Sequence, residues 1–143
     1  MKIAVGNDHR GYKMKEQIVG WLADNGYDVL DCGSANEASS DYPDYASVVA
    51  DTVSQGKAIL GILICGTGIG MCMTANKYEG IRAALCYQPE YAVLTRKHND
   101  ANILCLGELN GDLLNLEVLE AFMNTEFEGG RHQRRVDKIS CSF

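Results

Sequence analysis

The chain has 143 residues, of which 46% are hydrophobic and 22% charged, and its formal net charge is −6 at pH 7. This length suits one domain with a proper core and is too short for two ordinary ones, so we expect a single domain over residues 1–143. The negative charge disfavours nonspecific binding to nucleic acid or to an anionic membrane, because such partners need a cationic surface.

Strands and helices alternate along the predicted chain. Apolar runs of strand length occur at 2–7, 27–31, 58–65, 81–86 and 102–106. Helical patterns lie between them at 12–23, 44–54, 69–77 and 90–97, and one long final helix is expected to begin near Asp112. The alternation predicts an α/β fold: a Rossmann-like, three-layer α/β/α sandwich around a five-stranded parallel sheet with right-handed crossovers.

The segments that follow the strands are the candidate functional segments. In parallel sheets of this kind, ligands bind beyond the carboxyl ends of the strands. That rule selects Asp8 and His9 after the first strand, residues 65–70 after the third, and the segment after the fourth.

The segment Cys65-Gly66-Thr67-Gly68-Ile69-Gly70 is the most informative of these. Its alternate glycines allow a tight turn that points successive backbone N–H groups at one spot, which is an oxyanion or phosphate cradle at the start of a helix. The spacing matches neither the dinucleotide fingerprint nor the P-loop, so both nucleotide interpretations weaken. A tight turn around a buried cysteine explains the same spacing without any function.

Other polar residues have both a functional and a purely structural interpretation. Asp8 and His9 are also typical helix caps, and His98-Asn99 suits the end of a helix. Arg131 and Arg135 are four residues apart, so on a helix they share one face and form a plausible phosphate clamp, although short basic runs are usually solvated helix ends. Tyr42 is expected in the loop after the second strand, where a tyrosine ordinarily just packs.

We expect a cytoplasmic protein, because the sequence offers no apolar signal segment and no run near the ~20 apolar residues of a membrane span. In that compartment the six cysteines should be reduced thiols. No two cysteines form a Cys-x-x-C pair, so zinc is not expected.

Seven segments, in this order along the chain, resemble the type B ribose-5-phosphate isomerases. They are Gly6-Asn7-Asp8-His9, Asp41-Tyr42-Pro43-Asp44-Tyr45-Ala46, Ile64-Cys65-Gly66-Thr67-Gly68-Ile69-Gly70-Met71, Ala75-Asn76-Lys77, Gly80-Ile81-Arg82-Ala83, His98-Asn99-Asp100-Ala101-Asn102 and Gly129-Gly130-Arg131-His132-Gln133-Arg134-Arg135. The resemblance covers nearly the whole chain. That family belongs to one superfamily with the galactose-6-phosphate and allose-6-phosphate isomerases.

The resemblance implies a homodimer with active sites between the subunits, and it leaves open whether dimers pair into tetramers. It implies interconversion of ribose 5-phosphate and ribulose 5-phosphate through an enediolate, in the pentose phosphate pathway, without cofactor or metal. The partner would be a small sugar phosphate.

The resemblance also assigns roles to individual residues. Cys65 would be the base, and Thr67 would assist ring opening together with Asp8 and His98. The turn formed by Gly66, Thr67, Gly68, Ile69 and Gly70 would bind the enediolate. His9, Arg131 and Arg135 would bind the phosphate. Tyr42 and Asn99 complete the expected substrate-binding residues.

Two features of the sequence bear on these assignments. The loop at 107–111 lacks the arginine that many relatives carry after the last strand, which puts a phosphate contact there in doubt. Residues 71–74 contain no glutamate, the base that some relatives place there, and this favours Cys65. The alternatives are an isomerase of allose or galactose 6-phosphate, a noncatalytic nucleotide- or phosphate-binding module, and a redox sensor suggested by the cysteines.

Overall fold

A five-stranded parallel sheet forms the centre of the molecule. The structure is a computed structural model that describes residues 1–139. The strands are β1 (Lys2–Asn7), β2 (Asp28–Asp31), β3 (Leu60–Cys65), β4 (Ala83–Leu85) and β5 (Ile103–Gly107). Every strand pair is parallel and the order across the sheet is β2-β1-β3-β5-β4, so the predicted parallel sheet is confirmed.

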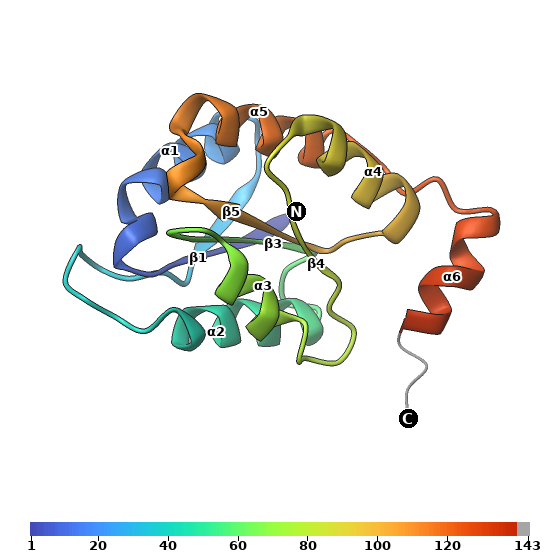
Figure 1. Ribbon diagram of the computed structural model, residues 1–143, viewed down its shortest axis with the longest axis horizontal. Helices are drawn as coiled ribbons and strands as arrows, with labels where there is room; N and C mark the ends of the chain where they lie inside the picture. The colour runs from blue at the N-terminus through green and yellow to red at the C-terminus, as the bar shows by residue number, and fades with distance from the viewer. Residues whose placement is uncertain (140–143) are drawn as a thin grey trace.

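Helices cover both faces of the sheet and make the predicted three layers (Figure 1). One face carries α1 (Tyr12–Asp24), α4 (Pro89–Asn99) and α5 (Asp112–Met123), and the other carries α2 (Tyr42–Ser54) and α3 (Ile69–Ala75). Two 3-10 turns, η1 (His9–Gly11) and η2 (Glu108–Asn110), follow β1 and β5. No helix within residues 1–139 is long and apolar enough to cross a membrane.

The central strand β3 supplies side chains to two separate hydrophobic cores. Ile62 and Ile64 belong to the core beneath α1, α4 and α5, whereas Leu63 and Cys65 belong to the core beneath α2 and α3. Successive side chains of a strand point to opposite faces, and full burial of an Ile or Leu stabilises the fold by about 1.5–3 kcal/mol. The strand is therefore fixed in register, and Cys65 faces the side covered by α2 and α3.

The expectation of one long final helix is wrong. Helix α5 ends at Met123, and a separate helix, α6 (Arg131–Ile139), follows. Gly129 and Gly130 have φ values of 70° and 57°, a backbone conformation that interrupts a right-handed helix. Helix α6 consequently lies beyond α4, at the end of the molecule away from α1 (Figure 1).

Candidate functional site

The strand order changes direction across the sheet between β1 and β3. From β1 the chain passes to β2 on one side and then crosses to β3 on the other. Such switch points hold the ligand beyond the carboxyl ends of the strands. Asp8 follows β1 and Cys65 ends β3, and the Asp8 backbone N–H donates to the Ile64 carbonyl at 3.3 Å. The fold thus brings these two predicted residues to one place.

Cys65 lies at the base of the glycine-rich turn. Its side chain is 6% exposed, and its Sγ accepts a hydrogen bond from the Gly68 N–H at 3.1 Å. Gly68 has φ +80°, in the left-handed region that favours glycine, and this conformation turns the amide toward the sulfur. The Thr67 hydroxyl accepts the Ile69 N–H at 3.2 Å. Two successive backbone amides of the turn thus bond the Cys65 thiol and the Thr67 hydroxyl.

Tyr42 forms one wall beside this turn. The structure places it at the first residue of α2, so the expectation of a loop position is wrong. A Cβ added to Gly70 would lie 2.6 Å from Tyr42 Cζ, which means that only glycine lets the ring approach this closely. Tyr42 remains 41% exposed. Its ring therefore packs against the start of α3 and remains partly exposed.

Asp8 and His9 are held by local hydrogen bonds. The Asp8 Oδ1 atom accepts the N–H groups of Arg10 at 2.9 Å and Gly11 at 3.2 Å, which is a helix-cap geometry. His9 Nδ1 accepts the Ser40 N–H at 3.2 Å, so a neutral His9 carries its proton on Nε2. His9 therefore presents a hydrogen-bond donor away from Ser40.

The other predicted residues lie at the opposite end of the molecule. Helix α4 starts beyond the carboxyl end of β4 and runs back along the sheet, so that His98 and Asn99 precede the start of β5. In the sheet Ile103 pairs with Gly61, at the start of β3, whereas Gly107 pairs with Cys65. The length of β3, at about 3.3 Å per residue, therefore separates His98 and Asn99 from Cys65.

Arg131 and Arg135 join His98 and Asn99 at this second end. Both lie in helix α6, so the predicted helical face is confirmed, and α6 packs on α4 through the buried side chains His132 and Val136. Arg131 Nη1 lies 3.9 Å from Glu128 Oε1. This end of the chain thus combines an imidazole, an amide and two guanidinium groups.

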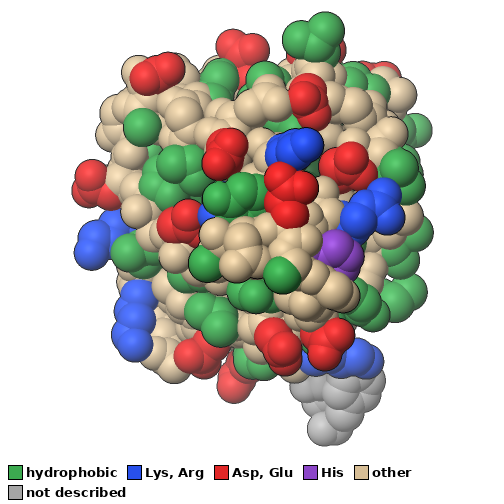
Figure 2. All heavy atoms as spheres, turned by 90° about the vertical axis from the view of Figure 1, so that its left-hand side faces the viewer, with side chains coloured by type: hydrophobic (Ala, Val, Ile, Leu, Met, Phe, Trp, Pro, Cys, Tyr) green, Lys and Arg blue, Asp and Glu red, His purple; other side chains and the backbone are tan. Residues whose placement is uncertain are grey.

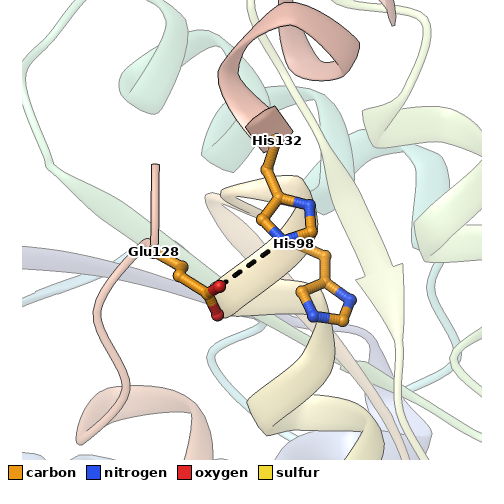
Figure 3. Close-up of side chains that lie close together, drawn as sticks. All are labelled: His98, Glu128 and His132. Carbon is orange, nitrogen blue, oxygen red and sulfur yellow. Dashed lines mark ion pairs between the residues drawn. The ribbon is translucent and has the colours of Figure 1, made fainter. Parts of the chain in front are cut away.

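His98 and His132 stack on each other, with ring centroids 4.3 Å apart and planes 17° apart (Figure 3). Glu128 Oε1 lies 3.7 Å from His132 Nε2. One ligand atom from each of these three residues lies within 4.8 Å of the others, a spacing that suggests a metal site. Stacked rings point their nitrogen lone pairs in parallel rather than at one ion, and Arg131 disfavours a cation here. We therefore assign no metal to this cluster.

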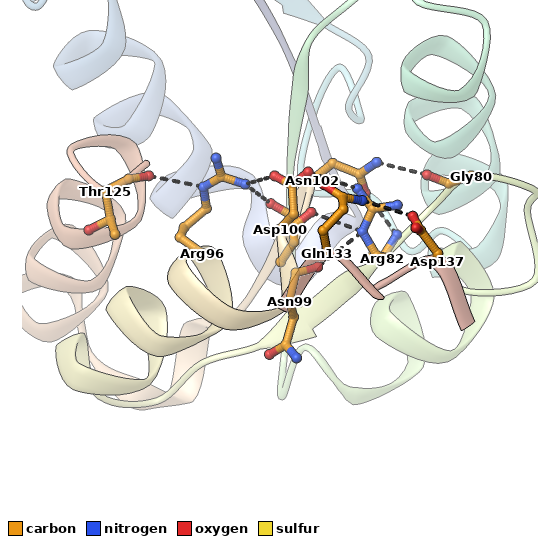
Figure 4. A network of polar contacts seen from close by, with 10 residues as sticks. Gly80, Arg82, Arg96, Asn99, Asp100, Asn102, Thr125, Gln133 and Asp137 are labelled. Carbon is orange, nitrogen blue, oxygen red and sulfur yellow. Dashed lines mark hydrogen bonds and ion pairs between the residues drawn. The ribbon is translucent and has the colours of Figure 1, made fainter. Parts of the chain in front are cut away.

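A network of polar contacts fixes the turn that follows His98 (Figure 4). Asp100 adopts φ 46° and is held by Arg96 Nη1 at 2.9 Å and Arg82 Nη2 at 3.4 Å. Arg82 Nε also donates to the carbonyls of Asn99 and Asp100, each at 3.0 Å. The Asn99 side chain points away from this network and is exposed. Its amide is therefore available to a ligand.

The family model for ribose/galactose isomerases matches residues 3–139. The chain belongs to the ribose/galactose isomerase family.

Individual members of the ribose/galactose isomerase family cover almost the whole chain. Ribose-5-phosphate isomerase B of Escherichia coli is 46% identical over 141 residues, covering 98% of this chain and 95% of the relative. A Clostridium thermocellum ribose-5-phosphate isomerase B structure has a TM-score of 0.96 at 48% identity, with coverage of 98% and 95%. The Mycoplasma genitalium enzyme, solved with bound ribulose-5-phosphate, has a TM-score of 0.94 at 44% identity, with coverage of 98% and 94%.

In this member of the ribose/galactose isomerase family, the predicted residues lie in two separate groups, which we call the first and the second half-site. The first half-site comprises Asp8, His9, Tyr42, Cys65, Gly66, Thr67, Gly68, Ile69 and Gly70. The second half-site comprises His98, Asn99, Arg131 and Arg135. The face at the carboxyl ends of the strands shows scattered acidic, basic and hydrophobic side chains and no continuous basic patch (Figure 2). The arginine pair of the second half-site is thus remote from the thiol of the first.

Three residues that lie beside the first half-site were missed in the sequence. Arg10 packs over the turn, with its Cζ 3.6 Å from a Cβ built on Gly66, and its Nη2 pairs with Glu108 Oε2 at 3.2 Å. Tyr87 donates to the Thr67 carbonyl. All three follow the carboxyl ends of strands, so the rule that selected Asp8 could have found them. Glu108 begins η2, in the loop that lacks the arginine of many relatives.

Two hollows of the surface are lined by residues of the half-sites. A hollow of about 170 Å³ is lined by Gly66, Thr67, Tyr87, Gly107, Leu109 and Asn110. A larger one, of about 750 Å³, lies at the other end, where Asn99 and Arg82 line it together with Ile139 of α6. The smaller hollow is therefore lined by Gly66 and Thr67 of the glycine turn, which directly follow Cys65.

Proposed function

We propose that the protein is an aldose–ketose isomerase that interconverts D-ribose 5-phosphate and D-ribulose 5-phosphate through an enediolate. One observation carries the proposal: the Cys65 sulfur lies in a glycine turn, 3.1 Å from the Gly68 amide nitrogen. The Mycoplasma genitalium relative solved with ribulose-5-phosphate supports the choice of substrate. We place the reaction in the pentose phosphate pathway and the enzyme in the cytoplasm.

In this proposal Cys65 transfers the proton. Its thiolate takes the proton from C2 of the open-chain aldose and returns it to C1, which needs no metal or redox cofactor. Removal of that proton places negative charge on oxygen. The N–H groups of Gly68 and Ile69 already bond Cys65 and Thr67, so the remaining backbone amides of residues 66–70 would stabilise this charge. In comparable sites each such donor contributes about 3–4 kcal/mol.

We further propose that the working site is shared between two subunits of a homodimer. A five-carbon sugar phosphate is too short to reach from Cys65 to Arg131 within one chain, because the length of β3 separates the half-sites. A second copy related by two-fold symmetry would bring its own second half-site to the first. His98 would then assist ring opening with Thr67 and Asp8, and Arg131 and Arg135 would bind the phosphate with His9.

Exposed apolar side chains next to the turn support such an interface. Ile69 and Met73 are 43% and 65% exposed, and they lie one helical turn apart on α3. Exposed apolar residues on one face commonly mark a protein contact. We expect Met73→Glu to shift the protein toward monomers in analytical ultracentrifugation and to lower its activity in parallel. A dimer that persists with full activity would place the interface elsewhere.

The second candidate is an isomerase of allose 6-phosphate or galactose 6-phosphate, within the same superfamily. The family model covers both ribose and galactose isomerases. Only the measured activities on the different sugar phosphates can therefore decide between the two candidates. The Arg131 and Arg135 pair favours the ribose type.

The test is a ketose-formation assay with the three sugar phosphates in the presence of a chelator. Activity on ribose 5-phosphate that disappears in Cys65→Ala and persists in Cys32→Ala supports both the reaction and the base. Cys32 is a suitable control because it is a half-buried thiol that directly follows β2, away from the glycine turn. Full activity in Cys65→Ala would refute the role of the thiol, and preference for a six-carbon sugar would select the second candidate.

A further inference from the structure

His132 is buried beside His98 of the proposed site, yet its Nε2 atom makes no hydrogen bond to the described residues. Its side chain is 5% exposed, and its Nε2 atom has no hydrogen-bond partner in the part of the chain that the structure describes. A buried polar atom without a partner costs about 1–3 kcal/mol, so a residue retained at such a position needs an explanation.

The stacked geometry supplies that explanation. The His132 ring lies 4.3 Å from that of His98 in a nearly parallel stack, and it reaches there from α6, a separate helix (Figure 3). His98 is half-buried, and its backbone is held in place by the turn that Asp100 fixes through its ion pair with Arg96. Without a neighbour on its flat face, an imidazole can turn about χ2, because that torsion is broad. The stack restricts this rotation.

We propose that His132 is a positioning residue: its neutral ring stacks on His98 and fixes the plane in which His98 meets the substrate during ring opening. The proposal rests on the proposed function, because it assumes that His98 acts on the sugar ring. His132 itself stays buried and touches neither substrate nor reacting atoms.

The surroundings of His132 keep its ring neutral. Burial lowers its pKa from the usual 6.5, and the positive charges of Arg131 and, more weakly, Arg135 act in the same direction, as does His98. Glu128 is the one group facing His132 that acts in the opposite direction. A neutral His132 leaves His98 free to gain or lose a proton without an adjacent imidazolium ion.

The kinetic test separates orientation of His98 from anchoring of α6. His132→Ala removes the stack, so kcat for ribose 5-phosphate should fall about 10- to 100-fold with a smaller change in KM, as expected when a reacting group is misplaced. His132→Phe keeps a flat ring and should retain most of kcat. Val136→Ala is the matched control, because Val136 is the other buried anchor of α6 and should raise KM only. If His132→Ala behaves like Val136→Ala, the residue is only an anchor.

A second measurement reads ring opening directly. In the Cys65→Ala background, where proton transfer is blocked, exchange NMR measures how fast the enzyme interconverts the α and β anomers of ribose 5-phosphate. Adding His132→Ala should lower that rate by the same factor as kcat, and an unchanged or absent catalysed exchange would overturn the proposal. Anomer exchange does not require isomerisation. A negative result in this measurement would therefore contradict the role of His132 without contradicting the proposed isomerase function.

A third measurement tests the neutral state. The chain has three histidines, so NMR can follow each imidazole separately in a pH titration. His132 should remain neutral down to a pH below 6.5, and Glu128→Gln should then reduce kcat at pH 7.5 no more than the control Glu126→Gln, which changes an exposed carboxylate two residues away. A His132 that is protonated at pH 7.5, with Glu128→Gln as damaging as His132→Ala, would indicate an ion pair instead of a neutral stack.

Discussion

The Tyr87 hydroxyl donates a hydrogen bond to the backbone carbonyl of Thr67 at 2.8 Å. This bond ties the segment after β4 to the glycine turn after β3. The Tyr87 carbonyl in turn accepts a hydrogen bond from the Asn110 side-chain amide at 3.2 Å. This second bond connects the segment after β5 to the segment after β4. Three loops at the carboxyl edge of the sheet therefore hold one another around Cys65.

Tyr87→Phe should loosen the glycine turn. We expect kcat to fall a few-fold while the free energy of unfolding drops by about 1 kcal/mol or less, because a single partly exposed hydrogen bond is lost. Steady-state kinetics and urea unfolding measure the two effects. Tyr91→Phe is a suitable control, since Tyr91 is 60% exposed and is also located after β4. Equal effects of the two changes would contradict the special role of the Tyr87 hydroxyl.

Gly70→Ala should push Tyr42 away from the start of α3. The added Cβ would lie 2.6 Å from Tyr42 Cζ, and we expect an overpacking cost of about 1–3 kcal/mol with a marked loss of activity. Thermal unfolding and the isomerase assay measure the result. Gly20→Ala is the matched control, because nothing lies within 4 Å of a Cβ at that position in α1. That change should instead stabilise the helix by about 0.5–1 kcal/mol.

Cys72 should react with alkylating agents at neutral pH, and this reaction can be mistaken for modification of Cys65. A hydrogen bond from the Cys105 thiol lowers the pKa of Cys72 to about 7, with a further contribution from the Leu85 backbone, while burial opposes the shift. This lower pKa raises the thiolate fraction of Cys72 at neutral pH, and the thiolate is the reactive form.

Mass spectrometry after a short iodoacetamide pulse tests this. Labelling of Cys72 should rise between pH 6 and 8, whereas Cys86, whose pKa burial raises to about 11, should stay unlabelled over that range. Cys105→Ser should change the pH at which Cys72 becomes reactive. Labelling of Cys72 only above pH 9 would show that the hydrogen bond does not act as described.

Asp100→Ala should disturb the second half-site without touching the first. The change removes the carboxylate that pairs with Arg82 and Arg96, and it places alanine at φ 46°, a conformation unfavourable for it. Asp100 is partly exposed, so we expect a loss of about 1–2 kcal/mol of stability rather than the larger cost of a buried pair.

The kinetic consequence of Asp100→Ala should appear in the steps that we assign to His98 and Asn99. Activity should fall at least a few-fold, while alkylation of Cys65 by iodoacetamide should keep its wild-type rate. Asp51→Ala provides a control, because Asp51 is an exposed carboxylate on α2, outside both half-sites. A slower reaction of Cys65 in Asp100→Ala would mean that the damage spreads through the sheet.

The sequence by itself determined the five strands, their parallel arrangement and the glycine turn, because these depend on local patterns. The apolar run ending at Cys65 becomes β3 since its side chains alternate between two cores, and Gly68 adopts the positive φ that its lack of a side chain permits. The family resemblance also rested on short segments in their order along the chain, and it supplied the candidate site residues.

Only the tertiary structure decided which of those residues meet. Gly129 and Gly130 divide the expected final helix, so α6 folds back on α4 and brings His132 onto His98, far from Cys65. The pairing of Arg10 with Glu108 is also invisible in the sequence, since the two residues belong to loops at opposite ends of the chain. Such contacts depend on how the sheet orders its strands and on where each helix ends, which are properties of the packed molecule and not of any local segment.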